Sequence, residues 1–276
     1  MFDVHVHSGP CVVERLADDL TTVGWYEEAG FSGCVLKGHC EPTVGRAAAV
    51  GAGRALQVYG GIVLNHVVGG LNPAAVDAAL TMGARVVWLP TVDAAHHHRS
   101  GLVHPPSCAP TVGRGPSYAA PPADPTTEGA LRTIMGLVAD ADAVIATGHV
   151  NPQEASWVVD QARRAGVRRV LLTHPSFTVP GMSAPDTREL CERGALAEVT
   201  AYQLLHQPDW DAARLAAFIR EVGYEHCLLS SDAGQPDSPR GPEALRGLVD
   251  ALAAEGLDRG ALEAMASEVP AGLVVP

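Results

Sequence analysis

The chain has 276 residues, of which 47% are hydrophobic and 18% are charged, and its formal net charge is -12. This length fits one large α/β domain or two smaller ones, and the acidic balance argues against the broad basic surface that nucleic-acid binding needs. We expect neither a secretory signal nor a membrane span, because the sequence shows no basic-then-apolar start and no run of about 18 apolar residues. Six scattered cysteines without a C-x-x-C pair predict reduced thiols in a cytoplasmic protein.

Short apolar runs recur along the chain and predict buried strands. Val, Ile and Leu dominate these runs without strict apolar/polar alternation, which is typical of parallel strands covered on both faces. Eight such strands are predicted, over residues 3–7, 33–37, 57–64, 85–89, 143–147, 169–173, 196–200 and 226–230.

The segments between the runs carry helix signals. Asn72-Pro73 and Asn151-Pro152 each place a capping residue before a first-turn proline, and Gly30 and Gly223 are typical residues just past a helix end. Helices are predicted over residues 14–29, 43–56, 72–83, 126–139, 151–166, 185–193, 210–222 and 244–255.

This eightfold alternation predicts a TIM-type (β/α)8 barrel, with a doubly wound open sheet as the alternative. No change in composition marks a second domain, so residues 1–276 are predicted to form one barrel. Residues 91–125, rich in Pro, Gly, Ser and His, form a long irregular segment after strand four. Such segments are usually functional or mobile, and we expect this one to be a lid over the mouth of the barrel.

The first strand carries two histidines that can share a ligand. In Asp3-Val4-His5-Val6-His7, an extended backbone puts His5 and His7 on one face and Val4 and Val6 on the other. Two imidazoles on one face can reach a single divalent cation. The alternative is a surface strand that carries two histidines by coincidence.

Further polar residues follow the other predicted strands. In a barrel these positions meet at the C-terminal ends of the strands, where active sites are built. They are Lys37 and His39 after strand two, Asn65 after strand three, Asp93 and His96–His98 after strand four, His149 after strand five, His174 after strand six and Asp232 after strand eight.

This ordered set resembles the amidohydrolase superfamily of metal-dependent hydrolases. Members carry His-x-His on strand one, single histidines after strands five and six, and an aspartate after strand eight. The residues 268–273, Glu-Val-Pro-Ala-Gly-Leu, also resemble the short Asn-Pro-Ala-x-x-Leu segment that ends many members. The resemblance spans nearly the whole chain.

The resemblance implies a ligand set and a cofactor. His5, His7, His149 and His174 correspond to metal ligands, and the alternative for His174 is a contact with the attacking water or the substrate. Asp232 corresponds to a metal-bound general base. The implied cofactor is one or two divalent ions, zinc first, with manganese and iron as other candidates. Such an ion brings the pKa of a bound water toward neutrality and polarises a carbonyl.

The sequence departs from the superfamily at strand four, which offers no carboxylated lysine or glutamate to bridge two metals. Lys37 is the chain's only lysine, and three interpretations compete for it: a cation for an anionic substrate group, an unusual carboxylated bridge, or a structural ion pair. His39 is predicted to be a ligand, a substrate contact or a loop residue. Glu198, inside strand seven, would be buried and needs a partner, and we expect it to contact substrate, a metal or a histidine.

The predicted function is hydrolysis of a C–N or C–O bond in a small, anionic substrate, such as an amide, cyclic amide, lactone or ester. The alternatives are non-oxidative decarboxylation at a similar single-metal site, phosphoester cleavage of the polymerase-and-histidinol-phosphatase type, and a barrel without activity. Arg99 and Arg114 are additional candidates to bind an anionic group, and His96–His98 are expected to line the lid or face solvent. No nucleic-acid or membrane partner is expected. The sequence does not decide whether the chain forms a homo-oligomer.

Overall fold

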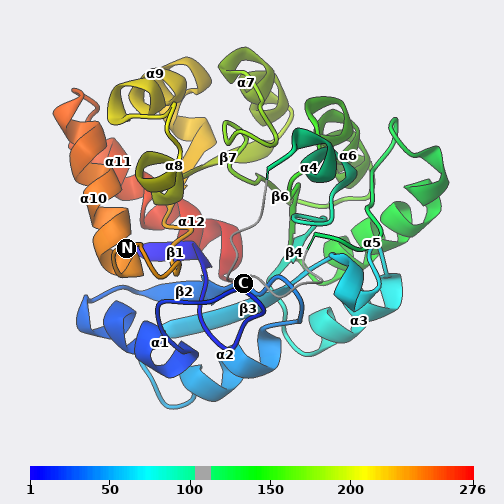
Figure 1. Cartoon of the computed structure of the whole chain (residues 1–276), viewed down its shortest axis with the longest axis horizontal. Coiled ribbons are helices and arrows are strands. Elements are labelled where there is room, and N and C mark those ends of the chain that lie inside the picture. The colour runs from blue at the N-terminus through cyan, green and yellow to red at the C-terminus, as the bar shows by residue number, and fades with distance from the viewer. Residues whose placement is uncertain (103–112) are drawn as a thin grey trace.

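The computed structural model describes residues 1–102 and 113–276, and it is an eight-stranded parallel barrel surrounded by helices (Figure 1). Each strand pairs with the next in sequence, in the order β1 to β8. The predicted TIM-type fold is therefore confirmed, and the doubly wound sheet is not formed. The strands are β1 Phe2–Val6, β2 Gly33–Leu36, β3 Gln57–Val63, β4 Val86–Trp88, β5 Val144–Ala146, β6 Arg169–Leu172, β7 Ala195–Thr200 and β8 Cys227–Ser230.

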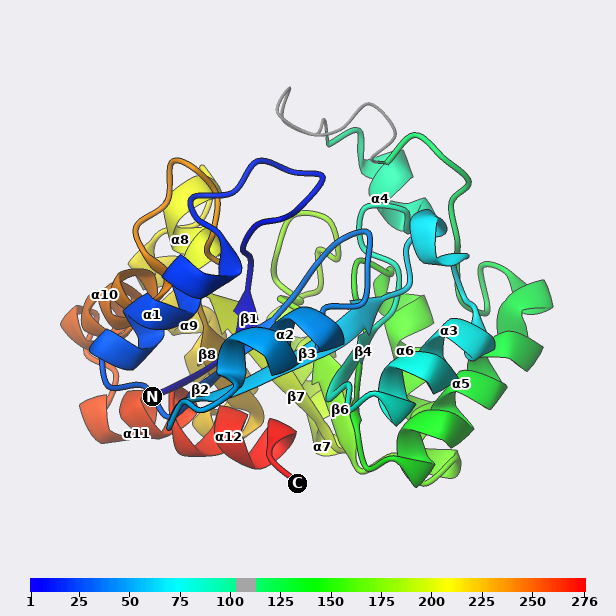
Figure 2. The same ribbon diagram turned by 90° about the horizontal axis from the view of Figure 1, so that it is seen from below.

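The strands bury apolar side chains on both faces, as their composition predicts. One cluster fills the barrel interior and includes Phe2, Val35, Trp88 and Leu228. It continues into Leu273 of the C-terminal helix, which covers the N-terminal end of the barrel (Figure 2). Since one end is closed by this packing, the opposite end is the one open to a ligand.

A second, larger cluster lies between the sheet and the helices. Each fully buried aliphatic side chain there contributes about 1.5–3 kcal/mol to folding. The helices are α1 Asp19–Glu28, α2 Val44–Gly51, α3 Pro73–Thr81, α4 Ala95–Ser100, α5 Glu128–Asp140, α6 Pro152–Arg164, α7 Ala184–Glu192, α8 Ala201–His206, α9 Ala212–Val222, α10 Gly241–Ala254, α11 Arg259–Met265 and α12 Glu268–Val274.

The capping signals place several helix starts correctly. Asn72 and Asn151 accept hydrogen bonds from the first turns of α3 and α6, and at α6 Glu154 completes a capping box. The predicted helix over residues 14–29 is wrong in its first third, because α1 begins only after Asp18, whose carboxylate caps Thr21 N at 2.8 Å. Residues 14–18, which the sequence predicts to be helical, are instead part of a loop above the barrel.

The segment after β4 is partly helical. It contains α4, and a bridge between Ala94 and Tyr118 ties its two ends together. Figure 2 shows α4 at the end of the barrel opposite α12. Residues 103–112 of the expected lid, with His104 and Cys108, lie outside the described residues.

Strand β1 is irregular in a way that the sequence did not indicate. Its register against β2 shifts between Asp3 and Val6. Val4 therefore packs inside the barrel and Val6 outside it, so the expectation that these two valines share a face is wrong. His5 and His7 still share the inner face.

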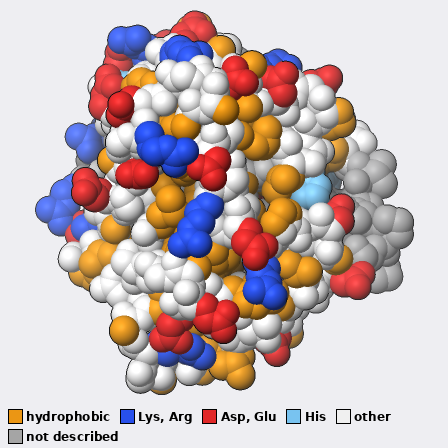
Figure 3. Space-filling view, turned by 90° about the vertical axis from the view of Figure 1, so that its left-hand side faces the viewer, with side chains coloured by type: hydrophobic (Ala, Val, Ile, Leu, Met, Phe, Trp, Pro, Cys, Tyr) orange, Lys and Arg blue, Asp and Glu red, His pale blue; other side chains and the backbone are white. Residues whose placement is uncertain are grey.

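The molecular surface carries mixed charge. On the face at the left of Figure 1, acidic and basic side chains are interspersed (Figure 3). Within the described ranges, no helix is both long and apolar enough to cross a bilayer.

Candidate functional site

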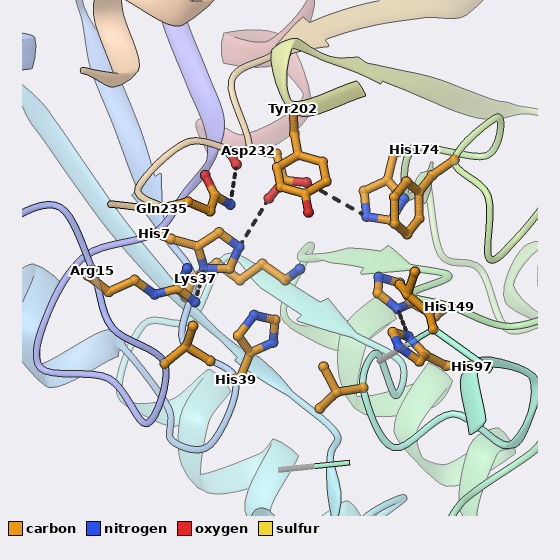
Figure 4. A pocket seen from close by; sticks show the side chains of 14 residues that line it. His7, Arg15, Lys37, His39, His97, His149, His174, Tyr202, Asp232 and Gln235 are labelled. Atoms are coloured by element: carbon orange, nitrogen blue, oxygen red, sulfur yellow. Dashed lines mark hydrogen bonds and ion pairs between the residues drawn. The ribbon is translucent and has the colours of Figure 1, made fainter. Parts of the chain in front are cut away.

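A pocket of about 220 Å³ opens at the C-terminal ends of the strands (Figure 4). Its walls come from strand ends and from the loops that follow them, which is where barrel folds place active sites. The lining residues are His7, Val13, Arg15, Lys37, His39, Val92, His97, Leu102, His149, His174, Phe177, Tyr202, Asp232 and Gln235.

Three acceptor atoms converge at the base of this pocket. Nε2 of His5 and Nε2 of His7 each lie 3.1 Å from Oδ1 of Asp232. The convergence follows from closure of the barrel, because Asp232 N donates to His5 O and His7 N donates to Ala233 O, both at 2.9 Å. These hydrogen bonds bring residues more than 220 positions apart into one buried group that can hold a metal ion.

The outer nitrogens of both histidines are already engaged. Nδ1 of His5 lies 2.9 Å from Oε1 of Glu198, and Nδ1 of His7 lies 2.9 Å from the carbonyl oxygen of Lys37. Since both partners accept hydrogen bonds, each Nδ1 carries a hydrogen, and the lone pair of each neutral ring is at Nε2. This is the arrangement that orients histidines toward a metal.

The charges of the group agree with this arrangement. Burial opposes ionisation of Asp232, but His5 and His7 hold the pKa of its carboxyl well below the ordinary value. Burial likewise disfavours a charged His5, yet Asp232 raises its pKa to about 9 in the metal-free protein. The group therefore holds a positive charge at neutral pH, as a proton on His5 or as a metal ion.

Lys37 lies beside the group rather than on the surface. It is buried, its Nζ is 3.0 Å from Nε2 of His5, and its ammonium faces the ring of Trp88 at 5.5 Å. Burial lowers the pKa of Lys37 to about 8. All three interpretations of Lys37 are consistent with this position. Because Lys37 lines the pocket, its location favours the first of them, a cation that binds an anionic group of the substrate.

His174 adjoins the group on the side away from His7. Its Nε2 is 4.0 Å from Oδ2 of Asp232, and its Nδ1 is buried without a hydrogen-bond partner. Burial lowers the pKa of His174 to about 4. His174 and Asp232 have positive φ angles, 26° and 49°, which are uncommon outside glycine and are found at functional sites.

His149 lies farther from the group than the resemblance implies. Its Nδ1 is 2.6 Å from Nδ1 of His97, which α4 supplies, and its ring is tilted against that of His174 at a centroid distance of 5.0 Å. Among the described residues, the compact group of metal-type ligands contains His5, His7 and Asp232 but not His149. The role of His149 as a ligand stays a prediction.

His39 lines the pocket beside the group. Its ring stacks on His7 at a centroid distance of 4.9 Å, and Asn65 fixes this stretch by donating to the His39 carbonyl at 2.9 Å. Burial holds the pKa of His39 well below its usual value, so the ring is neutral. Its contact with a substrate stays a prediction.

Glu198 lies behind His5 and does not line the pocket. It is fully buried, and it also accepts hydrogen bonds from the Ser230 hydroxyl at 2.7 Å and from His174 N at 3.1 Å. The contact with His5 provides one of the partners expected for Glu198, and its role toward a substrate stays a prediction.

Several pocket residues escaped the sequence analysis. Arg15, Tyr202 and Gln235 lie in loops or in a short helix, and no spacing in the sequence marks them. His97 was expected to line the lid or face solvent, and it is buried in the pocket wall. Arg99 and Arg114 are exposed and do not line the pocket.

Similar solved structures share the fold. An amidohydrolase from Pseudomonas aeruginosa superposes with a TM-score of 0.67 at 10% identity, covering 99% of this chain and 95% of that one. An organophosphorus hydrolase from Deinococcus radiodurans gives 0.63 at 13% identity, covering 99% and 92%. A 2,6-dihydroxybenzoate decarboxylase from Rhizobium gives 0.59 at 11%, covering 99% and 98%. The expected likeness to the amidohydrolase superfamily is confirmed at the level of the fold.

Sequence comparison gives a family without an assigned activity. No curated protein matches the chain. One family model, described as a family of unknown function, matches residues 1–198 and so includes His5, His7, Lys37, His149 and His174. The chain belongs to this family, DUF6282.

Proposed function

We propose that this protein is a metal-dependent hydrolase that cleaves a C–N or C–O bond in a small, anionic substrate. Amides, cyclic amides, lactones and esters are the candidate classes. One observation carries the proposal: Nε2 of His5, Nε2 of His7 and Oδ1 of Asp232 face one another at the base of an open pocket. Three ligand atoms in that arrangement can hold one divalent cation.

The donor set fits a divalent metal. Two neutral imidazoles and one carboxylate, with the pocket on the open side, are the ligand set of a catalytic zinc site. Manganese and iron also accept nitrogen and oxygen ligands, and His149 and His174 are candidates for a second ion. A metal held there supplies Lewis acidity, which lowers the pKa of water and polarises a carbonyl group.

The protein's own groups supply proton transfer and binding. Asp232 is ionised, so it can accept a proton from the attacking water at Oδ2 and pass it to the leaving nitrogen or oxygen. His174, 4.0 Å from that atom and neutral, can hydrogen-bond to the water or the substrate. Lys37 and Arg15 place positive charge in the pocket walls for an anionic group.

Decarboxylation is the second candidate. Strand β4, Val86–Trp88, supplies no residue to bridge two metals, and the compact ligand group fits the single ion that this reaction would use. The products separate the two reactions, since a decarboxylase releases carbon dioxide without adding water. A phosphoesterase would instead release inorganic phosphate or an alcohol from a phosphoester.

Metal analysis of protein purified without chelator tests the proposal. We expect at least one equivalent of a divalent metal, and its loss in Asp232→Asn and His5→Ala. His226→Ala is the matched control, because His226 lies outside the pocket, and it should keep the metal. Absence of stoichiometric metal, or full retention in Asp232→Asn, would contradict the proposal. The metal-loaded protein is then screened with amides, lactones, esters, carboxylic acids and phosphoesters, with turnover of one class expected.

A further inference from the structure

The loop between β1 and α1 brings an arginine into the pocket. Arg15 lies in the stretch that precedes the cap at Asp18, and its side chain reaches from that loop to the edge of His7 (Figure 4). It lines the pocket together with Val13 from the same loop.

The His7 nitrogen that the Arg15 guanidinium contacts is not an acceptor. Nη2 of Arg15 lies 3.2 Å from Nδ1 of His7. That Nδ1 lies 2.9 Å from the carbonyl oxygen of Lys37, and because a carbonyl only accepts, the nitrogen must carry the hydrogen. Two donors therefore face each other, and the contact with His7 does not satisfy Arg15.

Among the described residues, no other group satisfies it either. Nε of Arg15 is buried without a hydrogen-bond partner. Across residues 1–102 and 113–276, no carboxylate lies within 4.0 Å of this guanidinium, whereas Arg46 pairs with both Asp19 and Glu41. An arginine stays charged at every physiological pH, so Arg15 holds an unpaired positive charge at the pocket wall. Such a group is costly to desolvate unless a ligand pairs with it.

The geometry points to a substrate carboxylate as that ligand: we infer that Arg15 binds it and that the substrate is a small carboxylic acid with an apolar body. The planar guanidinium matches a carboxylate with two parallel hydrogen bonds. Val13, Leu102 and Phe177 provide apolar walls, and the pocket of about 220 Å³ admits only a small molecule. This inference rests on the proposed function and deepens it, because it names the anionic group of the substrate and the residue that binds it.

Binding of three probes to the metal-loaded protein tests the inference by calorimetry: phenylacetate, the neutral phenylacetamide and phenyl phosphate. We expect wild type to bind phenylacetate more tightly than phenylacetamide. Arg15→Met should weaken phenylacetate binding by about ten- to a hundredfold, the value of a charged hydrogen-bonded pair, and leave phenylacetamide unchanged. Arg15→Lys should recover part of the loss. Arg99→Met, which removes an exposed arginine outside the pocket, should behave as wild type.

Metal content is measured for every variant, so that a change in the metal site is not taken for a change at Arg15. Equal binding of phenylacetate by wild type and Arg15→Met, at equal metal content, would overturn the inference. An Arg15-dependent preference for phenyl phosphate would overturn the assignment to a carboxylate. If the protein discriminates phenylacetate through Arg15 but hydrolyses nothing, the proposed function fails while the inference stands.

Discussion

Oε1 of Glu198 lies 2.9 Å from Nδ1 of His5, and both side chains are almost completely buried, at 0% and 1% exposed. The contact fixes the hydrogen of His5 on Nδ1 and directs Nε2 toward Asp232. Glu198 is therefore a positioning residue for the proposed metal ligand. Its burial raises the cost of its charge, yet His5 keeps the pKa of the Glu198 carboxyl below its ordinary value.

Replacing Glu198 by Gln should weaken metal binding without unfolding the barrel. The amide keeps the size of the carboxylate but accepts a weaker hydrogen bond and lowers the basicity of His5. We expect metal affinity to fall by about ten- to a hundredfold, measured by competition with a chelator of known affinity.

Glu154→Gln is the matched control for this variant. Glu154 is also buried, but it caps α6 by accepting from Asn151 N at 2.7 Å and does not line the pocket. It should lower stability and leave metal affinity unchanged. Equal loss of metal by both variants would contradict the positioning role of Glu198.

The fold could be predicted from the sequence because its signal is local. Buried parallel strands require continuous apolar runs, so all eight strands were found, and Asn151-Pro152 marked α6 because its side chain bonds to its own helix. The strand-end residues Lys37, His174 and Asp232 followed from the strand assignment, and all three line the pocket.

The remaining site residues depend on contacts that no local pattern records. Arg15 enters the pocket only because α1 starts at Asp19, and His97 enters only because α4 packs against the end of β5. The register shift in β1 likewise arises from pairing with β2, so the positions of Val4 and Val6 could not be read from alternation. Loop placement and strand register are set by tertiary packing, and the sequence leaves them open.

The metal-free protein should lose stability as the pH falls below neutrality. Burial lowers the pKa of His174 to about 4 and holds those of His7, His39 and His149 well below 6.5. Below pH 6.5 the unfolded chain binds protons that the folded chain does not, so the free energy of unfolding rises with pH. His174 alone accounts for about 3 kcal/mol between pH 6.5 and 4. Urea unfolding at pH 5, 6 and 7 measures the slope.

A matched variant tests the source of that slope. His174→Asn removes one buried neutral imidazole, so its stability should depend less on pH than that of wild type, whereas His226→Asn should leave the slope unchanged. The assignment is wrong if wild type is equally stable at pH 5 and pH 7.

His97 and His149 should act as a unit. One ring donates to the other across the 2.6 Å contact between their Nδ1 atoms, and both rings are buried, so removing either partner leaves the other without this bond. In a double-mutant cycle with His97→Ala and His149→Ala, we expect a coupling of about 1 kcal/mol in the free energy of unfolding. The pair His97→Ala and His226→Ala should be additive. Additivity of the first pair would show that the contact does not hold α4 on the barrel.

Lys37→Met should strengthen metal binding. In the protein as described, the Lys37 ammonium lies 3.0 Å from Nε2 of His5, so its positive charge repels a divalent cation held by that nitrogen. Methionine keeps the length of the side chain and removes the charge, and we expect metal affinity to rise by about tenfold, the effect of removing one like charge at this range. Chelator competition below pH 8, where Lys37 is charged, measures the change. If Lys37 is instead a carboxylated ligand, the variant will bind metal more weakly, and the affinity of wild type will rise with added bicarbonate.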